Sequence, residues 1–215
     1  APAARTTQDG RRGVTVWPWE HLAFGYLVVA LALRATRGRT LTDVEAVLVV
    51  LATLLPDLVD KPLAWRFEVL PSGLSLAHSL LFAGPLLVAV VALATWRDRP
   101  AAGWGVALAY GSHLVGDAVY PVVFGDPVRM DFLLWPVREV PPSRPSLGLL
   151  GHVSVYFDRL TALLATPQGS WFLALEVALV GGALCLWLFD GVPGLRQPWR
   201  WTVAALSPPD DTGGP

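Results

Sequence analysis

Apolar stretches long enough to cross a lipid bilayer recur about five times along this chain of 215 residues. A spanning helix needs about 20 mostly apolar residues. The chain is 53% hydrophobic and 15% charged, whereas soluble domains carry about 25% charged residues. The sequence therefore predicts an all-α, multi-pass protein of the cell membrane. The expected spans are Val14–Ala35, Leu41–Val59, Ala77–Trp96, Ala101–Phe124 and Ser170–Phe189.

The long connection between the last two spans, residues 125–169, predicts a helix of its own. Prolines break its first half and exclude a long helix there. Its second half, Leu149–Leu164, has apolar residues at helical spacing with Asp158 and Arg159 beside them. This pattern is typical of an amphipathic helix lying on the membrane surface. We expect a polar segment at 1–13, a transmembrane domain at 14–189 and a mobile tail at 190–215.

Charge and cysteine content exclude several classes of partner and site. The net charge is −1, and no basic patch of the size that nucleic acid requires is present, so we expect no nucleic-acid partner. The single cysteine, Cys185, lies in an apolar run. Neither a disulfide framework nor a thiolate metal site is therefore available, and nitrogen and oxygen atoms would have to hold any metal.

Polar side chains inside the apolar stretches mark the expected site. Such residues cost several kcal/mol in a bilayer unless they pair or bind something. When the spans alternate in direction, all of them fall toward one face of the membrane. They are His21, Asp57, Asp60, His78, His113, Asp117 and Glu176.

His113 and Asp117 lie four residues apart on the fourth expected span and share one helical face. An imidazole nitrogen and a carboxylate oxygen at this spacing can reach the same ion, about 2.0–2.2 Å away. The alternative is a carboxyl group hydrogen-bonded to a neighbouring helix. We expect both residues to be metal ligands.

Asp57 and Asp60 follow Pro56, which we expect to end or kink the second span. We predict Asp57 as a ligand and Asp60 as a supporting residue or a general base. The alternative for both is a solvated helix end, with Lys61 as the partner in a salt bridge.

Three further residues complete the predicted set. His21 and His78 near the starts of their spans are expected ligands, although either could be an imidazole at the membrane interface. Glu176, the only charge in the fifth span, is a candidate base or ligand, or else a packed neutral acid. His152, on the surface helix, fits an interfacial histidine better than a ligand.

Histidines and carboxylates without cysteine suit zinc, manganese or iron. One or two such divalent ions, zinc above all, could generate hydroxide near neutral pH and polarise a phosphoryl or carbonyl oxygen. The chain has no glycine-rich phosphate loop and no Gly-x-Ser-x-Gly elbow. Haem held by two histidines is a different possibility, but it would leave the carboxylates without a role.

At these residues the chain resembles the LexA-binding inner-membrane-associated hydrolase family. The shared elements are His21, Pro56–Asp60, Ala77–Ser79, His113–Asp117 and Trp135–Pro136, in the family's order over about Trp17–Val137. Of the family's His-Arg-x-x-Thr-His element, the stretch Gly73–His78 keeps only the last histidine, which leaves the number of metals open. The family is distantly similar to zinc-dependent phospholipases C and related zinc nucleases.

The resemblance implies metal-dependent hydrolysis of a phosphoester such as a lipid headgroup. Its partners would then be membrane lipid and, in a second reading, a larger membrane assembly. In that second reading the protein is a catalytically silent structural or accessory subunit, whose metal holds helices together.

Overall fold

The computed structural model describes residues 16–143 and 147–196. These residues form helices without any strand, as the sequence predicts. The helices are α2 (Pro18–Arg37), α3 (Asp43–Trp65), α4 (Leu80–Trp96), α5 (Pro100–Val119), α6 (Gly148–Leu164) and α7 (Pro167–Phe189), with the short 3-10 helices η1 (Tyr120–Phe124) and η2 (Phe132–Leu134). The expected polar segment 1–13 and most of the expected tail lie outside the described residues.

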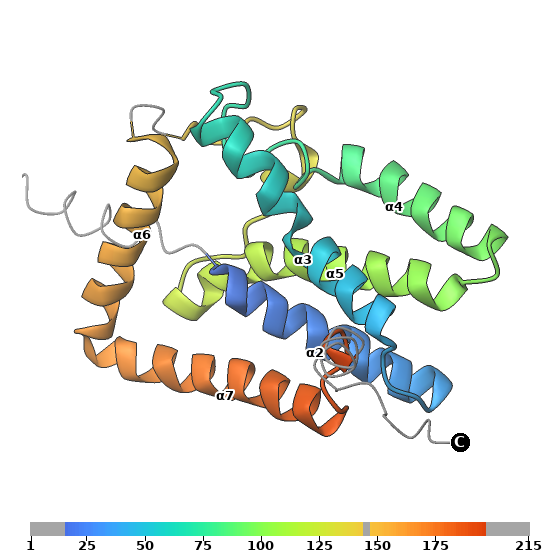
Figure 1. Ribbon diagram of the computed structural model, residues 1–215. Helices are drawn as coiled ribbons and strands as arrows, with labels where there is room; N and C mark the ends of the chain where they lie inside the picture. Colours follow the sequence, from blue (N-terminus) through green and yellow to red (C-terminus); the bar gives the residue numbers. More distant parts are fainter. Residues whose placement is uncertain (1–15, 144–146, 197–215) are drawn as a thin grey trace, which may run out of the picture.

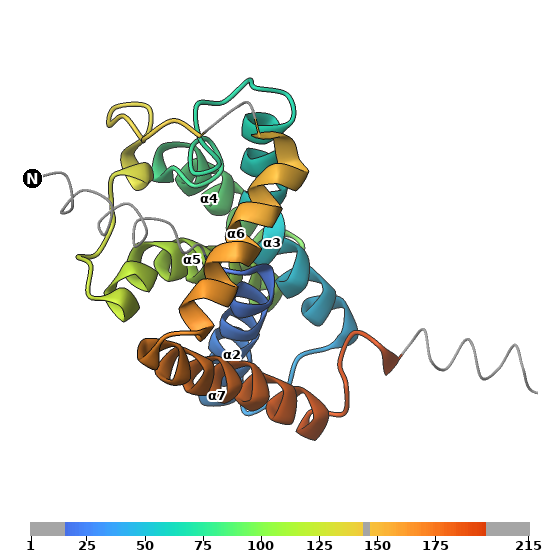
Figure 2. The same cartoon turned by 90° about the vertical axis from the view of Figure 1, so that its left-hand side faces the viewer.

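Helices α2, α4, α5 and α7 lie roughly along one direction, with α5 running opposite to the other three, and α3 crosses them obliquely (Figure 1). Helix α6 stands nearly perpendicular to α7 and passes across one end of this group (Figures 1 and 2). The same end carries the start of α2, the end of α3, the start of α4, the end of α5 and the start of α7. We call it the α6 end.

Two apolar cores lie on either side of α5. One joins α2, α3 and α5 through residues such as Val29, Val49 and Ala109. The other joins α4, α5 and the connection after η1 through Tyr110, Leu114 and Phe132, among others. Helix α5 therefore forms the centre of the molecule, and its polar residues face neighbours on several sides.

Helices α2 and α3 approach closely at Gly25, where an added Cβ would lie 2.5 Å from the Thr53 Oγ1 atom. Gly25 has no Cβ atom, so the two helices can come this close. The contact brings the backbone of α2 against α3, within one turn of His21 and Asp57.

The expectation that Pro56 ends the second span is wrong. Helix α3 continues through Pro56 and Pro62 to Trp65. Proline removes one backbone hydrogen bond and crowds the preceding turn. Contacts of α3 with both α2 and α5 hold the helix together, as neighbouring helices do for prolines in membrane proteins. Asp57 and Asp60 consequently lie on the helix rather than after it.

The third expected span also begins later than the sequence suggests. Helix α4 starts at Leu80, and the Ser79 Oγ atom caps it by accepting a bond from the Leu81 backbone nitrogen at 3.2 Å. His78 therefore belongs to the loop between α3 and α4. Loop geometry, which carries no periodic sequence pattern, decides its position.

Among the described residues, α7 is the one helix that is long and apolar enough to cross a bilayer by length and composition. Helix α4 is apolar but has only 17 residues. Helices α2, α3 and α5 carry the charged and polar residues of the expected site, which lowers their apolar character.

Candidate metal centre

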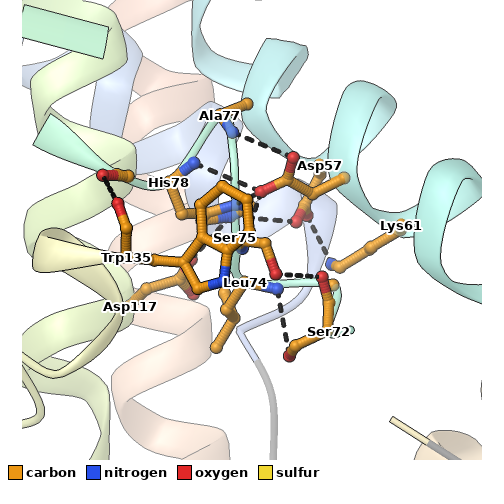
Figure 3. Close-up of polar contacts among 12 residues, drawn as sticks. Asp57, Lys61, Ser72, Leu74, Ser75, Ala77, His78, Asp117 and Trp135 are labelled. Carbon is orange, nitrogen blue, oxygen red and sulfur yellow. Dashed lines mark hydrogen bonds and ion pairs between the residues drawn. The ribbon is translucent and has the colours of Figure 1, made fainter. Parts of the chain in front are cut away.

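Three histidines and two aspartates meet near the α6 end of the helices. The His78 Nε2 atom lies 3.1 Å from His113 Nε2, 3.2 Å from Asp117 Oδ2 and 3.5 Å from Asp57 Oδ1. Figure 3 shows His78 with Asp57 and Asp117 around it. Residues from α3, α5 and the loop before α4 thus share one small volume.

His21 joins this group from α2. Its ring stacks on the His113 ring with centroids 3.7 Å apart, and its Nε2 atom lies 3.5 Å from Asp117 Oδ1. His113 Nε2 in turn lies 3.3 Å from Asp117 Oδ2 and 3.8 Å from Asp57 Oδ1. We call the five residues His21, Asp57, His78, His113 and Asp117 the central cluster.

Asp60 supports the central cluster from outside. Its carboxylate accepts bonds from the backbone nitrogens of Ser75 (2.8 Å), Ala77 (2.9 Å) and His78 (3.2 Å). It also lies 2.8 Å from the His78 Nδ1 atom. A proton on Nδ1 donates to this carboxylate, which leaves His78 Nε2 as the unprotonated atom that faces the cluster. Asp60 therefore fixes both the loop and the orientation of the imidazole.

The resemblance elements Ala77–Ser79 and Trp135–Pro136 also meet in space. The Ser79 Oγ atom donates to the Trp135 backbone oxygen at 2.5 Å. Phe132, just before this segment, is fully buried and packs edge-on against the His78 ring. The segment after η1 thus closes the side of the cluster that faces α4.

The central cluster is buried. The His21, His78 and His113 side chains are at most 1% exposed. Several buried polar atoms in the described part of the chain have no hydrogen-bond partner, and most of them belong to the cluster: His21 Nδ1 and Nε2, Asp57 Oδ1, His113 Nδ1 and Asp117 Oδ2, together with Thr53 Oγ1. Buried polar atoms are normally paired, so these atoms are consistent with a bound ion.

Charge at the cluster is also unbalanced. The Lys61 ammonium group contacts Asp57 Oδ2 at 2.5 Å, one turn along α3, while the other Asp57 oxygen faces the histidines. Three carboxylates, those of Asp57, Asp60 and Asp117, therefore face one lysine. With neutral imidazoles, a divalent cation would compensate the excess, and unpaired buried charge is costly.

Two overlapping groups of three residues have nitrogen and oxygen atoms close enough to share an ion. The first is His21, Asp57 and His113, and the second is His78, His113 and Asp117. This donor set fits a divalent metal such as zinc. It does not fit a haem between two of these histidines, because the stacked or nearly touching rings leave no room for a porphyrin.

Glu176 lies apart from the central cluster. Its Oε2 atom accepts from the Trp19 indole nitrogen at 3.1 Å. With Glu20, His21 and Tyr120 it lines a neighbouring cavity of about 240 Å³. Sequence reasoning places Glu20 beside His21 but misses Tyr120, whose hydroxyl donates to Glu20 Oε1 at 3.0 Å across 100 positions of the chain.

His152 has a different environment from the other histidines. Its ring stacks on Trp65 with centroids 4.6 Å apart, and its Nδ1 atom lies 2.7 Å from the Gly148 backbone oxygen. It joins α6 to the end of α3 and contributes nothing to the cluster.

The fold and the site define a small helical protein with a buried histidine–aspartate cluster. The chain belongs to the YdjM inner membrane protein family, whose sequence model matches residues 17–193. Membership in this family makes it a membrane protein. No curated protein and no solved structure matches the chain.

Proposed function

We propose that the chain crosses the membrane five times, through α2, α3, α4, α5 and α7, with α6 on the surface. Two observations support this topology. The five helices alternate in sense (Figure 1), and α4 and α7 expose large apolar side chains such as Val88, Leu93, Leu173 and Val177. In a bilayer these side chains would contact lipid tails rather than water.

We further propose that the protein is a metal-dependent hydrolase of a phosphoester such as a lipid headgroup. The observation that carries this proposal is the convergence of His21, Asp57, His78, His113 and Asp117 with several buried atoms left unpaired. These five residues would hold a divalent metal, with zinc the best fit. A metal in such a site supplies a nucleophilic hydroxide and polarises the phosphoryl oxygen.

Protein groups around the cluster would prepare it for this reaction. Asp60 orients His78. Because the Asp60 carboxylate already accepts four hydrogen bonds, it is better suited to positioning than to proton transfer. Lys61 holds one oxygen of Asp57 and leaves the other free. Glu176 lines the neighbouring cavity, so our proposal gives it no proton-transfer step.

A catalytically silent subunit is the second candidate function. The burial of the cluster favours this function, because the His78 and His113 side chains are 0% exposed and a substrate would have to reach them. A metal there would tie α2, α3 and α5 to the loop before α4, and the protein would serve a larger membrane assembly.

Metal analysis of protein purified in detergent without chelator tests the site. His113→Ala and Asp117→Asn should each lower zinc affinity at least about tenfold, as loss of even indirect ligand support does. Glu176→Gln, the matched carboxyl change outside the cluster, should keep the wild-type zinc content. Unchanged zinc content in both cluster variants would contradict the metal site.

An assay of phosphodiester release from lipid vesicles then separates the two functions. Hydrolysis that requires zinc and is lost in Asp117→Asn supports the hydrolase. Stoichiometric zinc without hydrolysis of any phosphoester lipid tested would favour the structural subunit.

A further inference from the structure

The cavity beside the central cluster has a mainly apolar lining that includes a few polar residues. It has a volume of about 240 Å³ and lies between α2, α7 and the end of α5 with η1. Glu20, His21, Tyr120 and Glu176 supply its polar groups. Apolar side chains, among them Phe24, Phe172 and Leu179, supply most of the rest. The cavity thus places two carboxyl groups in a mainly apolar lining.

Fixed hydrogen bonds hold the two carboxyl groups of the cavity in place. Glu20 is only 2% exposed, and it accepts bonds from the Tyr120 hydroxyl at 3.0 Å and from the Trp17 backbone nitrogen. Glu176 accepts from the Trp19 indole. The two carboxyl groups line the same cavity.

None of the described residues that line this cavity is a lysine or an arginine. Two neighbouring carboxylates repel one another unless a proton or a cation lies between them. The described lining thus offers oxygen acceptors in an apolar surrounding without a positive group to match them.

His21 links this cavity to the central cluster. Its side chain is 1% exposed, and both ring nitrogens lack a hydrogen-bond partner in the described structure. The ring lines the cavity on one side, while its Nε2 atom lies 3.5 Å from Asp117 on the other. A ligand in the cavity would therefore contact a residue of the cluster.

We propose that this cavity binds the primary ammonium group of an aminophosphate ester, with the phosphate toward the central cluster. The inference rests on the proposed hydrolase function and names its substrate class. A primary ammonium group has three N–H donors for carboxylate oxygens, and such charged hydrogen bonds are strong. A quaternary ammonium group has no N–H donor for these oxygens.

Direct lipid binding tests this inference without any hydrolysis. Short-chain phosphatidylethanolamine, phosphatidylcholine and phosphatidylglycerol with identical acyl chains are titrated into the protein in detergent, with chelator and with zinc. The wild type should bind phosphatidylethanolamine at least about tenfold more tightly than the other two, a difference that one or two charged hydrogen bonds supply.

Three variants assign the preference to the cavity. Glu20→Gln and Glu176→Gln should each reduce the preference about tenfold, and Glu139→Gln, at an exposed site away from the cavity, should keep it. Competition by soluble O-phosphoethanolamine would show that the free ester is sufficient. Its failure to compete would identify the lipid as the ligand.

Equal binding of the three lipids by the wild type would overturn the inference, as would a preference that survives both Glu20→Gln and Glu176→Gln. Zinc content is measured on the same preparations. Zinc-loaded protein without the preference contradicts the cavity assignment alone, whereas zinc-free protein with the preference contradicts the metal site alone.

Discussion

Asp60 holds the site in place although it is not one of the five residues of the central cluster. It is fully buried and binds both the His78 ring and three backbone nitrogens of one loop. A histidine that ligates a metal almost always donates its other N–H to such a partner, which sets the tautomer and ring orientation. One carboxylate therefore determines whether His78 can act as a ligand at all.

Replacing Asp60 with Asn should weaken the site without removing a ligand. Ala77 donates to one oxygen of Asp60, and Ser75, the His78 backbone and the His78 ring share the other. The Asn side chain has a single oxygen and its amide nitrogen accepts no bond, so it cannot serve both sets, and the loop or the His78 ring loses support. We expect zinc affinity to fall at least about tenfold, measured by competition with a chromogenic chelator. Asp126→Asn, at an exposed aspartate, is the control. Equal affinity of Asp60→Asn and wild type would contradict this role.

The residues of the central cluster and the neighbouring Asp60 can be picked out from the sequence, whereas the longer-range contacts around them cannot. His113 and Asp117 share a helical face, and the polar residues of each span stand out against apolar neighbours. The Asp57–Lys61 pair at four-residue spacing is also visible. Contacts such as Tyr120 with Glu20 and Trp19 with Glu176 join positions 100 and 157 residues apart, and no local pattern encodes them.

Helix α6 differs from the other long helices in direction. It lies across the ends of the others (Figure 2) and contacts α3 and α7. The stack of Trp65 on His152 fixes one of these contacts. The amphipathic pattern predicts the helix and its bounds, because periodicity is a local property. Its packing partners depend on the fold, and the sequence does not show them.

Cysteine labelling in intact membrane vesicles tests the orientation of α6. In a Cys185→Ala background, Ser154→Cys and Ala165→Cys should react with a membrane-impermeant thiol reagent from the same side, since a helix on the membrane surface exposes its polar face to one compartment along its length. Asp98→Cys, in the connection between α4 and α5, should react only from the opposite side. Reaction of Ser154→Cys and Ala165→Cys from opposite sides would make α6 a span.

At the scale of the whole molecule, the cluster joins α2, α3 and α5, which also share an apolar core, to the loop before α4. The two apolar cores lie on either side of α5, and the cluster bridges them near the α6 end of the helices. A ligand that binds only the folded state stabilises it by mass action, by about 2.7 kcal/mol at a concentration 100 times its Kd.

Removing the metal should therefore lower the thermal stability of the entire protein. Chelator treatment of the wild type in detergent should reduce the Tm by several degrees, and added zinc should restore it. Asp117→Asn should show no response to chelator. Thermal unfolding followed by circular dichroism measures both. A wild-type Tm that is the same with and without chelator would argue against a metal that contributes to folding.

The order of the central cluster along the chain has a consequence for biosynthesis. Its five residues lie between positions 21 and 117, and they come from four separate segments. A ribosome must therefore translate past Asp117, and in the proposed topology the nascent chain must insert α2, α3, α4 and α5, before the set is complete. Metal acquisition would then follow membrane insertion, and a chain interrupted before α5 would leave the membrane with unpaired aspartates and histidines, a feature that quality-control proteases could recognise.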